Sequence, residues 1–154
     1  MKRLKRLGVT RGKIERNVPS PESLLFLTFS FLDSIFRRFP MEDCIFCKII
    51  SGEIPCNKVY EDDYVLAFDD IYPVAPVHVI IVPKRHFGTL IDIPKNESEI
   101  FKNLFTAVQE VARLKGIADR GFRTVINTQE EGGQVIFHVH IHVFGGRQLK
   151  MELE

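Results

Sequence analysis

The chain lacks the features that mark secreted disulfide scaffolds, membrane-spanning proteins and repeat proteins. Its three cysteines cannot form the even framework of a small secreted domain, so a reducing compartment is expected. The apolar stretch that ends at Asp33 is well short of the roughly 20 residues that a membrane-spanning helix needs. No internal repeat or low-complexity tract is present. These absences, in a chain of 154 residues, predict one soluble globular domain with some excess length.

The formal net charge of +1 conceals an uneven distribution. Residues 1–40 hold nine Lys or Arg and three acidic residues, which leaves twelve of the 21 basic and seventeen of the 20 acidic residues in 41–154. Phosphate backbones are bound mainly through Lys and Arg. The acidic main part therefore argues against nucleic acid as a partner, whereas a small anionic ligand is compatible with it.

The first forty residues differ in composition from the rest. They run from a basic front to an apolar stretch, and turn and strand signals begin only after Met41. We interpret residues 1–40 as a poorly ordered extension, or one added by an upstream start codon, and residues 41–154 as the functional domain in the cytoplasm. The alternative is a targeting segment that leads to an organelle, because a basic front before an apolar stretch is the order of a signal peptide.

Hydrophobic periodicity in residues 41–154 predicts an α+β domain. Apolar residues with helical spacing indicate one long helix over 97–115, with a capping-box-like start at Asn96 and Glu99 and a stop at Gly116. A short helical turn is expected near 45–50, closed by Gly52 and Pro55. Strands are predicted at 58–61, 64–71, 77–83, 122–127 and 135–144. This order favours an antiparallel sheet with the helix on one face.

Three of the five histidines alternate along the last predicted strand. Side chains alternate across a strand, so His138, His140 and His142 share one face and the apolar residues between them share the other. Such a row suits two chemistries. It can place three nitrogens on one catalytic metal ion, or it can hold a nucleophilic central histidine whose neighbours orient it and bind a phosphate.

The segment His138–Phe144 matches the alternating His-φ-His-φ-His-φ-φ signature of the histidine-triad (HIT) family, in which φ is apolar. The sequence Gly145-Gly146-Arg147-Gln148 that follows resembles the Hint branch rather than the Fhit branch. The likeness also covers CIFCKIISGEIP, VYEDDYVLAFDDI, APVHVIIVPKRH and INTQEEGGQVI, and so spans residues 43–149 in family order.

The resemblance implies a fold, an assembly and an activity. It implies a five-stranded antiparallel sheet with one long helix, and a homodimer with a continuous ten-stranded sheet. The expected reaction is hydrolysis of purine nucleoside 5′-phosphoramidates to a nucleoside monophosphate and an amine, through a covalent nucleotidyl-histidine at His140. His142 would contact the phosphate, and His138 would hydrogen-bond onward toward His78.

Two other functions stay open. The chain could hydrolyse or transfer nucleotides from dinucleoside polyphosphates or nucleotide sugars, or it could be a nucleotide-binding regulatory protein without catalysis. The Gly-Gly-Arg-Gln ending disfavours the former, and retention of all three histidines disfavours the latter.

The resemblance also assigns the nucleotide site. Asp70 would bind the ribose hydroxyls. One residue of the site departs from the family pattern, because Val135 stands where many Hint proteins carry Ser or Thr. The full expected set is Ile45, Phe46, Ile49, Phe68 and Ile71 as apolar walls, Asp70 at the ribose, and Asn127, Gly133, Gln134, Val135, His140 and His142 around the phosphate and leaving group.

Cys44-x-x-Cys47 is half of a metal site. In some histidine-triad relatives such cysteines join two histidines, and the corresponding set here is Cys44, Cys47, His78 and His138, a Cys₂His₂ set suited to structural zinc. The alternative is that the thiols are free and His78 simply bonds His138. Cys56 and His86 are interpreted as ordinary residues.

Overall fold

The structure is a computed structural model in which residues 43–150 are described. The predicted extension at 1–40 lies outside these residues, so its two interpretations stay predictions. The elements, in chain order, are α2 (Ile45–Ile50), β1 (Lys58–Glu61), β2 (Val65–Asp69), β3 (Val77–Pro83), the 3-10 helix η2 (Leu90–Asp92), α3 (Glu99–Leu114), β4 (Arg123–Val125) and β5 (Ile141–Gly145).

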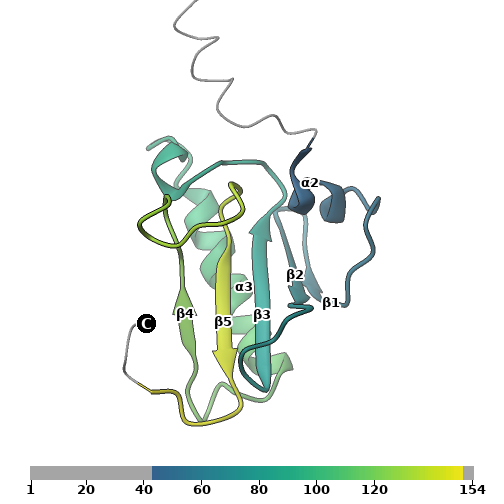
Figure 1. The fold of residues 1–154 in the computed structure, drawn as a ribbon, viewed down its shortest axis with the longest axis vertical. Helices are drawn as coiled ribbons and strands as arrows, with labels where there is room; N and C mark the ends of the chain where they lie inside the picture. Colours follow the sequence, from purple (N-terminus) through teal and green to yellow (C-terminus); the bar gives the residue numbers. More distant parts are fainter. Residues whose placement is uncertain (1–42, 151–154) are drawn as a thin grey trace, which may run out of the picture. The chain divides into compact units, whose positions relative to one another are not determined.

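The strands form one five-stranded sheet in the order β1-β2-β3-β5-β4, and every neighbouring pair is antiparallel. The long helix α3 covers one face of this sheet (Figure 1). The predicted fold class is therefore confirmed. The ten-stranded dimeric sheet stays a prediction.

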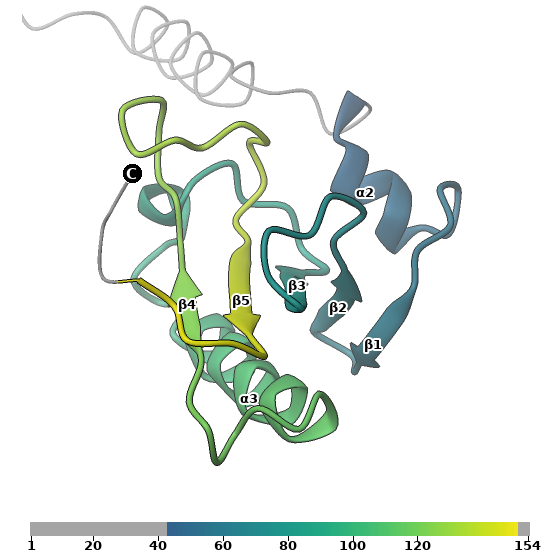
Figure 2. The same cartoon turned by 60° about the horizontal axis from the view of Figure 1, so that its bottom comes forward.

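The sheet separates two apolar clusters. On one face, Val79 and Ile81 of β3 pack with Leu104 and Val111 of α3 in the main core. On the other face, the alternate β3 residues pack with Phe46 of α2 in a smaller cluster. Figure 2 shows α2 and α3 on opposite sides of the strands. The small cluster matters for function because the histidine row lies on its side of the sheet.

The ends of α3 differ partly from the prediction. The helix begins at Glu99 with Ser98 as its N-cap, and no side chain caps it, so the predicted start at Asn96 is wrong. Gly116 has a φ of 66° directly after the last turn, which confirms the predicted stop. No helix in residues 43–150 is both long and apolar enough to cross a membrane.

The last strand is shorter than predicted. Pairing between β3 and β5 reaches only from Gly145 back to Ile141, which lies opposite Ile81. Before that point Val139 donates its main-chain N–H to Phe87 O, in the connection after β3. The chain at 135–140 therefore leaves the ladder because it bonds to a loop rather than to a strand.

Candidate functional site

The three histidines share one face of the sheet, as the alternation predicts, and this face is the one on which α2 lies. The main core under α3 contains the residues between and after the histidines, Val139, Ile141 and Val143. His138 and His140 are also buried, but they do not belong to that core. The arrangement holds although only His142 lies within β5. The row does not converge on one metal ion, because its three rings have different partners.

His140 has one nitrogen fixed and one free for chemistry. Its Nδ1 lies 2.7 Å from the main-chain oxygen of His138, so Nδ1 carries the proton and donates it to that carbonyl. Burial lowers the pKa of His140, against the opposing effect of this hydrogen bond. A neutral ring with Nδ1–H leaves the Nε2 lone pair unprotonated, which is the state that a nucleophile needs.

Phe46 braces two members of the row. Its ring meets His140 edge-on at 5.2 Å between centroids and His138 at 5.9 Å. Phe46 is 3% exposed and also contacts Phe68 in the small cluster. Aromatic edge contacts of this kind restrict ring rotation, so α2 helps to set the orientation of the nucleophile candidate.

His142 belongs to a second group of polar side chains, with His78 and Asp70. His78 Nε2 lies 3.0 Å from His142 Nδ1 and 3.3 Å from Asp70 Oδ2. The other carboxylate oxygen of Asp70 accepts the main-chain N–H of Tyr72 at 2.8 Å. Burial, reinforced by the neighbouring His140 and His78, lowers the pKa of His142 to about 4. His142 is therefore neutral at pH 7.

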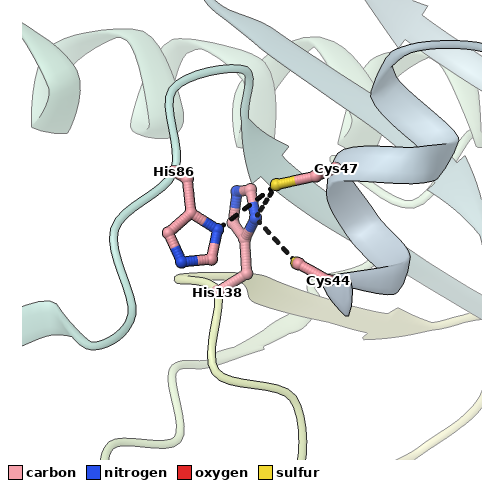
Figure 3. A group of neighbouring side chains, drawn as sticks. All are labelled: Cys44, Cys47, His86 and His138. Carbon is pink, nitrogen blue, oxygen red and sulfur yellow. Dashed lines mark hydrogen bonds between the residues drawn. The ribbon is translucent and has the colours of Figure 1, made fainter. Parts of the chain in front are cut away.

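His138 belongs to a separate cluster with two cysteines and His86 (Figure 3). Its Nδ1 lies 3.4 Å from Cys44 Sγ and 3.6 Å from Cys47 Sγ, and Cys47 Sγ lies 3.3 Å from His86 Nδ1. Zinc bonds of about 2.3 Å to sulfur and about 2.0 Å to nitrogen give tetrahedral sulfur–nitrogen edges of about 3.5 Å. The cluster therefore has the dimensions of a Cys₂His₂ metal site.

The hydrogen bonding of His138 also fits a metal ligand. Its Nε2 donates to Pro83 O at 2.9 Å, which leaves Nδ1 unprotonated toward the cysteines. Burial lowers the pKa of His138 to about 4, so the ring is neutral. Burial, with a smaller effect of Cys44, raises the pKa of Cys47 to about 12. Without a cation the Cys47 thiol thus keeps its proton.

The structure separates one of the four predicted metal ligands from the other three. His78 is not beside the cysteines and does not bond His138, and His86, interpreted as ordinary, takes its place. The register explains this, because His78 lies opposite Phe144 at the far end of the β3–β5 ladder. The carboxyl end of β3, at Pro83, is the end that meets His138. A histidine three residues after a strand end was the signal available in the sequence.

The predicted apolar walls divide into buried and exposed residues. Phe46 and Phe68 are 3% and 4% exposed and form the small cluster, against which Ile49 packs. Ile45 is 43% and Ile71 is 81% exposed. The two exposed side chains are available to a ligand, whereas the phenylalanines support the site from beneath.

The loop between β4 and β5 is held by Gln134. Its side-chain amide donates to Gly88 O at 2.7 Å and Ile136 O at 3.1 Å, and its Oε1 accepts the main-chain N–H of Gln129. Its own main-chain N–H donates to Gln129 O at 3.0 Å. All donors of Gln134 are thus used within the chain, where they anchor the loop. Its predicted place at the phosphate and leaving group stays a prediction.

The neighbours of Gln134 remain compatible with ligand contact. Asn127 Nδ2 donates to Gly133 O at 3.1 Å, and Gly133 has a φ of 74°, a conformation that favours glycine. Val135, at the position where many relatives carry a hydroxyl, is 87% exposed. The loop therefore presents main chain and an apolar side chain rather than a hydroxyl.

Comparison with known proteins finds relatives of this chain both by sequence and by structure. The HIT domain matches residues 51–149. Purine nucleoside phosphoramidase from Escherichia coli K12 is 42% identical over 108 residues, which are 70% of this chain and 91% of that protein. Protein HitA from Neisseria gonorrhoeae is 44% identical over 105 residues, which are 68% of this chain and 97% of HitA.

Solved structures agree with the fold. A histidine triad protein from Clostridium difficile superposes with a TM-score of 0.71 at 46% identity, covering 75% of this chain and all of that one. A HIT family hydrolase from Legionella pneumophila gives 0.69 at 42% identity, covering 71% of this chain and 97% of that one. The alternating histidines, the sheet that carries them and these matches together place the chain in the HIT family.

Proposed function

We propose that the chain hydrolyses purine nucleoside 5′-phosphoramidates to a nucleoside monophosphate and a free amine. The observation that carries the proposal is His140, a buried neutral imidazole whose Nδ1 is bonded to a main-chain carbonyl and whose Nε2 is free. The likeness to the E. coli protein named purine nucleoside phosphoramidase gives the substrate class.

The reaction proceeds in two displacements. His140 Nε2 forms a bond to the α-phosphorus while the phosphorus–nitrogen bond to the amine breaks, and the departing nitrogen takes up a proton from water. A water oxygen then bonds to the phosphorus, the bond to Nε2 breaks, and the water proton is released. The covalent nucleotidyl-His140 intermediate divides one difficult displacement into two easier ones.

His142 and Asp70 bind the two polar parts of the nucleotide. His142 stands beside His140, with ring centroids 4.9 Å apart, and contacts the phosphate oxygens as charge develops on them. Asp70 keeps lone pairs beyond its contacts with Tyr72 and His78, and these accept the ribose hydroxyls. His138 takes part through its main chain, whose carbonyl orients the nucleophile.

The enzymatic test is release of AMP from an adenosine phosphoramidate. We expect AMP from the wild type and none from His140→Ala, and the wild type should form a phosphoramidate-linked nucleotidyl-histidine that mass spectrometry detects after rapid quenching. Equal slow release by both proteins would contradict the proposal. AMP release from a dinucleoside polyphosphate, without release from the phosphoramidate, would change the substrate class.

We also propose that Cys44, Cys47, His86 and His138 hold a structural zinc ion. Four protein ligands close the coordination sphere, so the ion would supply stability rather than a reactive position. It would also hold His138, and hence the carbonyl that orients His140. Metal analysis should find about one zinc per chain in the wild type and in Cys56→Ser, but much less in Cys47→Ser. Absence of metal from all three would refute the assignment.

A homodimer is the proposed assembly. Phe105 on α3 is 51% exposed, and β4 ends the sheet order within the described residues. An exposed Phe and a sheet edge with unpaired main-chain N–H and C=O groups are each suited to contact with a second copy. Light scattering should give twice the chain mass, and Phe105→Glu should shift it toward the monomer more than Thr106→Glu does. A monomeric wild type would contradict the assembly.

A further inference from the structure

The buried pair formed by His78 and His142 raises the question of where its protons are. His78 is 6% exposed, and its Nε2 faces both His142 Nδ1 at 3.0 Å and Asp70 Oδ2 at 3.3 Å. The other nitrogen of His78, Nδ1, is buried without a hydrogen-bond partner among the described residues. A neutral imidazole carries one N–H and one lone pair, so the two nitrogens of His78 cannot be equivalent.

Two observations place the proton of His78 on Nε2. An ionised carboxylate only accepts hydrogen bonds, so a lone pair on His78 Nε2 would face a lone pair on Asp70 Oδ2 and repel it. In addition, a proton on Nδ1 would be a buried N–H without an acceptor, which is a costly arrangement. Because His78 then holds its N–H between Asp70 and His142, His142 Nδ1 must accept.

The proton of His142 follows from that of His78. A neutral His142 whose Nδ1 accepts a hydrogen bond carries its own proton on Nε2. We propose that His78 is a positioning residue that holds His142 as the Nε2–H tautomer, so that an N–H donor faces the phosphate beside the nucleophile. The identity of the phosphate acceptor rests on the proposed function, whereas the tautomer rests on the contacts of His78 alone.

The two neighbouring histidines are thereby held in complementary states. The carbonyl of His138 accepts from Nδ1 of His140 and leaves Nε2 bare for attack. The N–H of His78 donates to Nδ1 of His142 and leaves Nε2 as a donor. One nucleophile and one donor side by side are what an attack on a charged phosphorus requires.

The same reasoning argues against a metal ion between His78, His142 and Asp70, although their ligand atoms lie within 4.8 Å of one another. A metal on Nε2 would force the proton of His78 onto Nδ1, where no acceptor lies. Metal-bound histidines almost always donate from their other nitrogen. His138 meets this condition through Pro83, and His78 does not.

The test reads the tautomer directly, by ¹⁵N NMR of imidazole-labelled protein without substrate. We expect His142 in the wild type with its proton on Nε2. His78→Gln, whose amide reaches the position of Nε2 and can donate, should keep that tautomer. In His78→Leu this donor is lost, and the carboxylate of Asp70 in the same cluster is left as an acceptor for His142 Nδ1, so the proton should move to Nδ1. An Nδ1–H tautomer in the wild type would overturn the inference.

Kinetics separate positioning from a loss of fold. With the phosphoramidate, His78→Leu should lower kcat roughly tenfold to a hundredfold, because the developing charge on the phosphate loses one hydrogen-bond donor. His78→Gln should recover most of this loss. Equal kcat in all three proteins would refute the positioning role and leave the proposed function standing. If the wild type releases no AMP, the proposed function fails, and the NMR result still decides the tautomer.

Discussion

Acidification of the metal-free protein should destabilise it through His138. This ring is fully buried, and burial lowers its pKa to about 4 from the ordinary histidine value of 6.5. The unfolded chain, with a pKa near 6.5, therefore binds a proton that the folded chain does not. The stabilising effect is complete above pH 6.5 and is lost as the pH falls toward 4.

The size of the loss follows from these two pKa values. At 1.36 kcal/mol per pKa unit, the difference between 6.5 and about 4 amounts to about 3 kcal/mol once the pH is below both values. At pH 5 most of the unfolded chains but few of the folded chains are protonated, so the loss is about 2 kcal/mol. That is a large part of the 5–15 kcal/mol or so that stabilises a typical domain.

Urea denaturation in the presence of a chelator measures this effect. We expect the stability of the wild type to fall by about 2 kcal/mol more between pH 7.5 and pH 5 than that of His138→Gln, which can still donate to Pro83. His86→Gln is the matched control, because His86 is half-buried. Its pH dependence should stay closer to that of the wild type. Parallel curves for the wild type and His138→Gln would refute the reasoning.

Three further predictions concern the loops and the pH profile. Gly132→Ala should lower the melting temperature strongly, because an added Cβ would lie 2.3 Å from Thr128 O. Thr89→Ala should cost about 1 kcal/mol, since Thr89 caps η2 in a capping box, whereas Ser98→Ala should cost under about 0.5 kcal/mol because Ser98 makes no cap bond. The acid limb of kcat/KM should lie below pH 6.5, because burial lowers the pKa of His140; a limb above pH 6.5 would contradict the neutral nucleophile.

The sequence was sufficient where the signal is local. The β-branched run at 77–83 and the helical spacing after residue 97 each report burial of their own side chains, and both elements were predicted within a few residues. The alternating histidines were placed on one face because a period of two needs only an extended backbone. This held at His138 and His140 even though they lie outside the ladder.

The features that the sequence did not reveal depend on partners that are distant in the sequence. The start of β5 depends on Phe87, a loop residue that takes the N–H of Val139 away from the sheet. The role of Gln134 depends on Gly88 and Gln129, which no periodicity connects to it. The choice between His78 and His86 depends on strand register. His78 is five residues, or about 16 Å, from Pro83, the end of β3 that meets His138.

The three histidines of the row do not act as one relay, because each is fixed by a different part of the fold. His138 is held by the cysteines that flank the start of α2, His140 by the carbonyl of His138, and His142 by His78 at the far end of β3. A change in the cysteine cluster should therefore reach the nucleophile through one carbonyl and leave the state of His142 unaltered. Conversely, a change at His78 should alter the N–H donor on His142 and leave Nε2 of His140 free. The spacing in the sequence brings these groups together, but the register of β3 against β5 gives them separate tasks.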